Sequence, residues 1–534
     1  MPKANINGRE VEVEAGTTIM QAADRIGIWI PRYCYHPDLS IAGNCRICLV
    51  EVEGMPKLVT ACSTVVSDGM VVRTDTPVVK KAVTAVLEFL LLNHPIDCPI
   101  CDQAGECWLQ DYYMKIGLHP SRMPISRKVR KRKAIKLGKM IVMDQERCIL
   151  CSRCIRFCNE ITGTGELGFF NRGNKTAIGS FDDRPIENPY SGNLADVCPV
   201  GALTSNDFRF ARGVWLLQGV RSVCPACSTG CNIQIDFTDR TVYRFFPLRN
   251  PEVNRSWMCD EGRLSYKILN RTDRVTEPLI RKSGRLEPVT WGEAIKHAVG
   301  LLRPAMKKSS KMPAACIGTA RGTNEEMYLF KKLLDRLGSP EIDFRANGAA
   351  DPAAMEDSLL RRKDKNPNTT GALELGLLPG DGGSVLNAVL RGTRDGNVKV
   401  LYLLGPGIAD DKDFGELAKE ALAKASTVIL HTPWKCEEMK FASVVFPSAT
   451  FVEKEGTFTN YQRRVQRIGK AFDPPGEARD DLSILLAVLK ELGEKVRAND
   501  AADVMDLIAS EVRSFKGLRF SRIPSGGALL GREG

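Results

Sequence analysis

The placement of the cysteines is the feature that most limits what this chain can fold into. Sixteen of the 18 cysteines lie within the first 259 residues, and the remaining two are Cys316 and Cys436. The N-terminal residues form no apolar signal segment, so we expect neither export nor a framework of disulfides. The sequence therefore divides into a half built to bind metal and an ordinary globular half.

The first group of cysteines has the spacing C-x10-C-x2-C-x13-C. It is similar to the plant-type pattern for a [2Fe–2S] cluster, although its first gap is longer. We expect Cys45 and Cys48 to bind one iron from a single tight loop, with Gly43 letting backbone amides approach the sulfurs. Zinc is the alternative, but zinc ribbons usually carry two short C-x2-C pairs. The predicted ligands are Cys34, Cys45, Cys48 and Cys62.

The second group combines one histidine with three cysteines, in the spacing H-x3-C-x2-C-x5-C. A helix predicted from Pro77, with Thr76 as its N-cap, should end at His94-Pro95, because proline disfavours helix in the residue before it. The three cysteines lack a fourth thiolate, so His94 is predicted to complete a [4Fe–4S] site and to change its potential. The predicted ligands are His94, Cys98, Cys101 and Cys107. The other histidines are expected to be structural: His36, His119, His297 and His431.

Two further groups predict two more [4Fe–4S] sites. One is a C-x2-C-x2-C-x3-C run, whose fourth cysteine serves a different cluster in two-cluster ferredoxins. We therefore expect a distant Cys198-Pro199 to replace Cys158, which is then a small buried residue. The other has the spacing C-x2-C-x3-C-x27-C, with zinc again as the alternative. The two predicted sets are Cys148, Cys151, Cys154 and Cys198, and Cys224, Cys227, Cys231 and Cys259.

Charge and hydropathy limit the class of partner. The net charge is +11, but four bound clusters with their thiolates would contribute roughly −7, so a polyanion is not the expected ligand. The segment 127–139 contains eight Lys or Arg and no acid, and we interpret it as a solvated or partner-facing loop. The longest apolar run, Val83–Leu92, is broken by Glu88 and is too short to span a bilayer.

With these sets in view, the chain resembles the large iron–sulfur subunit of NADH:quinone oxidoreductase, the respiratory complex I. The resemblance rests on Gly43–Cys48, Cys101–Cys107, Asp196–Leu203 and the ligand spacings. It implies α+β N-terminal ferredoxin-like (β-grasp) iron–sulfur domains, one [2Fe–2S] cluster and three [4Fe–4S] clusters. It also implies an α/β molybdopterin-oxidoreductase-like domain without molybdenum.

The resemblance further implies partner subunits and a path for electron transfer. Hydride chemistry takes place on flavin in a partner subunit, and electrons then pass through the [2Fe–2S], the Cys148-type and the His94 sites toward the hydrophilic subunits on the quinone side. In the family, the Cys224-type cluster lies off this path. The expected location is peripheral, on the cytoplasmic side of the inner (plasma) membrane, held by partner subunits, and the chain needs no catalytic residue of its own.

The C-terminal half independently predicts an α/β fold. Thr290 and Glu293 form a capping box before a helix at Ala294–Leu302, and further helices are expected at Glu325–Leu337 and Phe414–Ala425. Buried strands are expected at Lys399–Leu404 and Thr427–His431. Similarity to molybdopterin enzymes extends over Thr319–Tyr328 and Ala442–Gln466, yet Phe344–Ala350 offers no Cys or Ser to ligate molybdenum. The expected domains are 1–78, 79–120, 138–216, 217–273, 274–480 and a helical C-terminal segment 481–534.

The predicted function is therefore transfer of single electrons between buried clusters. One alternative is the electron-transfer subunit of a soluble NAD-linked formate dehydrogenase or hydrogenase, although a formate enzyme should keep the molybdenum ligand. The other alternative is a zinc-bound interaction protein, which would be colourless.

Overall fold

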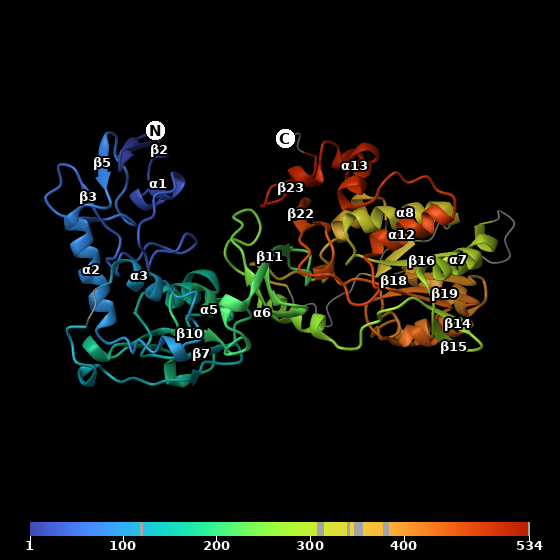
Figure 1. Ribbon diagram of the computed structural model, residues 1–534, viewed down its shortest axis with the longest axis horizontal. Coiled ribbons are helices and arrows are strands. Elements are labelled where there is room, and N and C mark those ends of the chain that lie inside the picture. Colours follow the sequence, from blue (N-terminus) through green and yellow to red (C-terminus); the bar gives the residue numbers. More distant parts are fainter. Residues whose placement is uncertain (118–120, 307–313, 339–341, 346–355, 378–383, 532–534) are drawn as a thin grey trace. The chain divides into compact units, whose positions relative to one another are not determined.

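The computed structural model describes residues 1–117, 121–306, 314–338, 342–345, 356–377 and 384–531. The chain forms two compact units, Met1–Leu217 and Gln218–Gly534, and Figure 1 labels some of their helices and strands. In the described part of the chain, no helix combines the length and the apolar character needed to cross a membrane.

The N-terminal unit begins with a five-stranded sheet of order β2-β1-β5-β3-β4. Asn7 and Gly8 have positive φ at the turn between β1 and β2, as Asn-Gly does in a tight hairpin turn. Helix α1 (Ile19–Arg25) starts at Thr18, whose side chain forms a capping box with Gln21. This arrangement is the expected β-grasp fold. The strands are β1 (Lys3–Ile6), β2 (Arg9–Glu12), β3 (Leu49–Val52), β4 (Val59–Thr60) and β5 (Met70–Arg73).

Helix α2 starts as predicted and ends earlier than predicted. It spans Pro77–Leu91, and the Thr76 side chain caps it. The prediction that it continues to His94 was wrong. The Lys128 ammonium donates to the carbonyls of Leu91, Leu92 and His94, so the end of the helix is capped by a side chain from far along the chain.

The rest of this unit consists of short elements around the cysteine loops. Two small sheets form, one of order β10-β7-β6 and one that pairs β8 with β9. The helices are α3 (Trp108–Ile116), α4 (Arg153–Arg156) and α5 (Asn193–Val197), and the strands are β6 (Ile135–Lys136), β7 (Ile141–Met143), β8 (Gly168–Phe170), β9 (Ala177–Gly179) and β10 (Leu203–Ser205).

The C-terminal unit opens with an antiparallel sheet and continues into a larger α/β layer structure. The sheet order is β11-β12-β13, and the larger, seven-stranded sheet has the order β15-β14-β20-β19-β18-β16-β17. The strands are β11 (Gln218–Val223), β12 (Asn232–Thr238), β13 (Thr241–Pro247), β14 (Leu279–Lys282), β15 (Arg285–Pro288), β16 (Ala314–Thr319), β17 (Ile342–Arg345), β18 (Val400–Leu404), β19 (Thr427–Thr432) and β20 (Val444–Pro447). Strands β16 to β20 pair in parallel, and β14 and β15 add an antiparallel edge.

The large sheet is buried on both faces, which explains the unbroken apolar sequence of its central strands. In β18, Val400, Tyr402 and Leu404 face one apolar core, and Leu401 and Leu403 face the other. Helices α7, α8, α12 and α13, which Figure 1 labels, contribute to the first core, and helices α10 and α11 contribute to the second. The predicted α/β fold of this half is confirmed. The helices are α6 (Asp260–Leu264), α7 (Trp291–Leu302), α8 (Asn324–Leu337), α9 (Thr369–Glu374), α10 (Ser384–Arg394), α11 (Gly415–Lys424), α12 (Asp481–Glu491) and α13 (Ala501–Glu511).

The C-terminal segment belongs to the body of this unit. Residues of α12 and α13 share one apolar core with α7 and α8. Strand β23 (Ala528–Leu529) pairs with β22 (Arg464–Ile468), which pairs with β21 (Gly456–Thr459). The segment therefore completes the core of the C-terminal unit.

Candidate iron–sulfur centres

The structure brings together the four cysteines predicted for the [2Fe–2S] site. Thiol hydrogen bonds join Cys34 to Cys45 and to Cys62, and they join Cys48 to Cys62. The Cys48 thiol contacts that of the distant Cys62, and the expectation that Cys45 and Cys48 bind one iron stays a prediction. Hydrogen bonds from Cys45 and Cys62 lower the pKa of Cys34. The same contacts raise the pKa values of Cys45 and Cys62, so all four sulfurs would be thiolates together only beside a positively charged centre.

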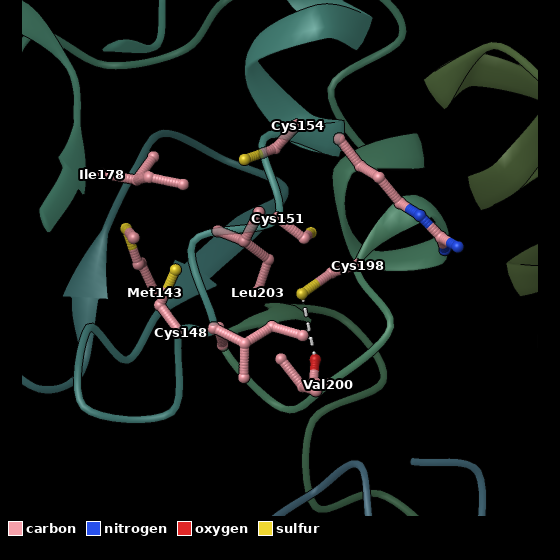
Figure 2. A pocket seen from close by; sticks show the side chains of 11 residues that line it. Met143, Cys148, Cys151, Cys154, Ile178, Cys198, Val200 and Leu203 are labelled. Carbon is pink, nitrogen blue, oxygen red and sulfur yellow. Dashed lines mark hydrogen bonds between the residues drawn. The ribbon is translucent and has the colours of Figure 1, made fainter. Parts of the chain in front are cut away.

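Three of the four cysteines in the C-x2-C-x2-C-x3-C run surround one cavity together with Cys198. Figure 2 shows Cys148, Cys151, Cys154 and Cys198 around this cavity, with Met143, Ile178 and Leu203 closing it. Cys158 is not among the residues that line the cavity. It is fully buried, with the carboxylate of Glu166 and the amide of Leu167 as its neighbours. This placement supports Cys198 as the fourth ligand.

The chemistry of this cavity fits a cationic metal centre. Burial raises the pKa values of Cys148 and Cys198 to about 12, so their thiolates are stable near neutral pH only beside positive charge. The Cys198 thiol donates a hydrogen bond to the Val200 carbonyl at 3.0 Å (Figure 2), which a metal bond would replace. Iron binding must therefore release protons.

The loop that carries these cysteines is conformationally strained. Leu150 and Ser152, on either side of Cys151, both have positive φ, and the Leu150 amide lies 3.4 Å from the Cys148 sulfur. A π-helical turn, Phe157–Ile161, follows α4. Left-handed backbone at non-glycine residues and π-turns both concentrate at functional sites. The strain is consistent with a loop shaped to aim amides at sulfur.

His94, Cys98, Cys101 and Cys107 line a second cavity, of about 140 Å³. Burial lowers the pKa of His94 to about 4, so its imidazole is neutral at pH 7, which is the form that ligates metals. The Ile96 amide donates to Nδ1 of His94. Because a neutral imidazole that binds iron through Nε2 must carry its proton on Nδ1, this contact would have to rearrange. Ile96 itself has positive φ, which is rare for a β-branched residue.

The two [4Fe–4S] sites of the N-terminal unit lie directly against each other. A Cβ placed on Gly201, three residues after Cys198, would collide with the Cys101 sulfur. Arg147, which precedes Cys148, forms a bidentate ion pair with Asp97 beside the histidine site. Neither contact could be found from ligand spacing, because each joins segments about 50 to 100 residues apart.

The basic segment 127–139 is mostly an exposed loop, in agreement with the expected solvated or partner-facing loop, although some of its charges also form contacts within the unit. Lys128 caps α2, and Lys133 forms ion pairs with Asp97, Asp144 and Glu146. Several of its charges therefore stabilise the N-terminal unit and surround the histidine site.

The fourth set lies in the C-terminal unit, and all four of its cysteines are buried. They are Cys224, Cys227, Cys231 and Cys259. Helix α6 begins just after Cys259, and the Gly262 amide donates to the Cys259 sulfur at 3.3 Å. A Cβ on Gly262 would come within 3.0 Å of the Cys224 sulfur and 3.4 Å of the Cys259 sulfur. Burial raises the pKa of Cys259 to about 12, so its thiolate, like those of Cys148 and Cys198, is stable near neutral pH only beside positive charge.

Among the residues that the structure describes, no three His, Cys, Asp or Glu side chains converge as they would around a single metal ion. Residues 346–350 of the segment examined for a molybdenum ligand lie outside the described residues, as does His119. Of the other histidines expected to be structural, His431 forms hydrogen bonds with Tyr402 and Asp481 in the core, and His297 is exposed on α7.

Family models match the chain along most of its length. The matches are a 2Fe-2S iron-sulfur cluster binding domain over residues 3–77, an NADH-ubiquinone oxidoreductase-G iron-sulfur binding region over 84–122, and an NADH-quinone oxidoreductase subunit 3 ferredoxin-like domain over 138–204. A molybdopterin oxidoreductase Fe4S4 domain matches residues 217–271, and a molybdopterin oxidoreductase model matches 274–366 and 363–491. The C-terminal unit is thus molybdopterin-oxidoreductase-like, as expected.

Curated relatives point to one protein family. The mitochondrial NADH-ubiquinone oxidoreductase 78 kDa subunit of Candida albicans is 31% identical over 94% of this chain and 84% of that protein. The NADH-ubiquinone oxidoreductase 75 kDa subunit of Reclinomonas americana is 42% identical over 63% of this chain and 48% of that protein. A solved NAD+-reducing [NiFe]-hydrogenase chain is 25% identical, covering 40% of this chain and 91% of that one, with a TM-score of 0.36, too low to support an argument. This chain belongs to the family of the large iron–sulfur subunit of NADH:quinone oxidoreductase.

Proposed function

We propose that this chain is the electron-transfer subunit of an NADH:quinone oxidoreductase, accepting electrons from a flavin subunit and passing them toward quinone. The proposal includes one [2Fe–2S] and three [4Fe–4S] clusters, held by the four ligand sets. When bound, such clusters act as one-electron carriers. The protein's part is to hold the ligands, exclude water and set the local charge.

The observation that carries this proposal is the serial contact of the three ligand sets in the N-terminal unit. The Arg156 guanidinium, two residues after Cys154, donates to the Cys34 carbonyl of the first set. Gly201, three residues after Cys198, lies against Cys101 of the histidine set. The segments that carry the Cys148 set therefore contact the segments of both other sets, which supports the order implied by the family.

The proposed partners are the flavin- and NADH-binding subunit and the hydrophilic subunits on the quinone side. The proposed location is the cytoplasmic side of the inner membrane, peripheral to the bilayer. The relatives from Candida albicans and Reclinomonas americana both carry NADH-ubiquinone oxidoreductase names. That agreement favours this assignment over a soluble hydrogenase or formate dehydrogenase.

Iron analysis and paramagnetic resonance of the purified, reduced chain test the proposal. We expect brown protein with signals from one two-iron and three four-iron centres. Cys198→Ser should remove one four-iron signal, whereas the matched control Cys158→Ser should keep it. Colourless protein rich in zinc would contradict the proposed function, and loss of the signal in Cys158→Ser alone would contradict the ligand set.

A further inference from the structure

Arg153 is a buried cation at the junction of the three ligand sets in the N-terminal unit. Its side chain is among the largest fully buried ones in the described residues, with 2% of the residue exposed. It lines the cavity formed by Cys148, Cys151, Cys154 and Cys198. A guanidinium in such a position needs a compensating charge, because an unpaired buried ion is strongly destabilising.

Each contact of Arg153 lies one residue from a predicted iron ligand. One guanidinium nitrogen donates to the Tyr35 carbonyl at 2.5 Å, and the other donates to the Val197 carbonyl at 3.3 Å. The guanidinium carbon lies 4.5 Å from the centroid of the Trp108 ring. Tyr35 follows Cys34, Trp108 follows Cys107, Val197 precedes Cys198, and Arg153 itself precedes Cys154.

Its surroundings provide no carboxylate. Across the described ranges, no Asp or Glu forms an ion pair with Arg153, and its Nε has no hydrogen-bond partner. Burial lowers the pKa of Arg153, and the nearby sulfurs of Cys151 and Cys198 oppose that shift. Arg147, the corresponding arginine beside the histidine site, is instead paired with Asp97. With a cluster bound, the thiolates of this set would therefore supply the negative charge beside Arg153.

We propose that Arg153 is the countercation of the cluster held by Cys148, Cys151, Cys154 and Cys198, and that it raises the reduction potential of this cluster. The inference rests on the proposed function. Reduction adds one negative charge to the centre, so a fixed positive charge next to it stabilises the reduced form more than the oxidised form. Because Arg153 also contacts the segments that carry the other two ligand sets, removal of its charge should lower the potentials of those two centres as well. Their potentials should fall by less than that of the cluster held by the Cys148 set.

The test compares Arg153→Met, Arg153→Lys and Arg172→Met in the full chain purified with its clusters. Methionine keeps much of the buried length and removes the charge, lysine keeps the charge, and Arg172 is an exposed arginine of the same unit. Midpoint potentials are measured by redox titration with paramagnetic resonance, and iron is counted per chain. In Arg153→Met we expect the reduction equilibrium of this cluster to become at least about tenfold less favourable, which is about 59 mV for a one-electron couple. Arg153→Lys should keep most of the potential, and Arg172→Met should match the native chain because exposed charge is screened.

Each outcome decides the matter. If Arg153→Met fails to load this centre while Arg153→Lys loads it, the countercharge role is supported. If both fail, or if lysine shifts the potential as much as methionine, packing and not charge is responsible, and the proposal is overturned. Iron present with an unchanged potential in Arg153→Met overturns this inference alone, whereas absence of iron from the native chain overturns the proposed function as well.

Discussion

Glu325 gives the C-terminal unit a stability that depends on pH. Its carboxylate is fully buried at the start of α8 and accepts hydrogen bonds from the backbone amide and the hydroxyl of Thr457, both at 2.9 Å. Burial raises the pKa of Glu325 from an ordinary 4.5 to about 7. The folded unit therefore binds this proton more tightly than the unfolded chain does.

The sign and size of the effect follow from this difference. The stabilisation is fully present below about pH 4.5 and is lost as the pH rises through about 7. At roughly 1.4 kcal/mol for each pKa unit, deprotonation should remove about 3 kcal/mol from the free energy of unfolding. Glu325→Gln keeps the shape of the side chain and cannot ionise, so the variant should not lose this stability.

Urea unfolding of the full chain between pH 5 and pH 8 measures the effect. The C-terminal transition can be followed by Trp291, which stacks on Phe446 at a centroid distance of 5.7 Å. We expect native protein and Glu325→Gln to unfold at similar urea concentrations at pH 5, and the variant to be more stable by about 3 kcal/mol at pH 8. The exposed Glu287→Gln is the control and should follow the native curve. Parallel pH curves for native protein and Glu325→Gln would refute the reasoning.

Three other perturbations should have measurable effects. Lys454→Met should destabilise the C-terminal unit by about 3–5 kcal/mol, because it leaves Glu326 buried without the ammonium 2.6 Å away. Urea unfolding measures this, and Glu326→Leu with Lys454→Met should recover most of the loss. Gly201→Ala should reduce the iron bound at the histidine site, because its Cβ collides with the Cys101 sulfur, whereas Gly300→Ala, which meets nothing within 4 Å, should keep full iron. Iron chelation during expression should unfold the N-terminal unit and leave the C-terminal unit folded, as far-ultraviolet circular dichroism and limited proteolysis would show.

Local rules predicted the elements whose causes are local. The caps at Thr76 and Thr290, the hairpin at Asn7-Gly8 and the buried strands β18 and β19 each depend on residues a few positions apart. The candidate ligand sets could also be proposed from the sequence, because cluster chemistry requires particular residue types at short spacings.

Features that depend on contacts between distant segments could not be predicted from the sequence. Nothing near Gly201 indicates that it lies against Cys101, and nothing near Arg153 indicates a buried position with no carboxylate partner among the described residues. The segments that carry Gly201 and Cys101 are about 100 residues apart and meet only in the folded unit. Such contacts are set by tertiary packing, which overrides local preference.

The expected effect of chelation rests on how differently the two units build their cores. In the N-terminal unit, one apolar cluster contains Cys34, Cys107 and Cys151, with Cys148 and Cys198 packed against it. These thiols lie in or against the cluster that packs the cysteine segments together, so iron binding energy is part of the folding energy of this unit. The two main cores of the C-terminal unit contain none of the predicted ligands and are built from both faces of a seven-stranded sheet and its helices. Loss of iron should therefore unfold the first unit and spare the second, and equal protease sensitivity of both units after chelation would contradict this account.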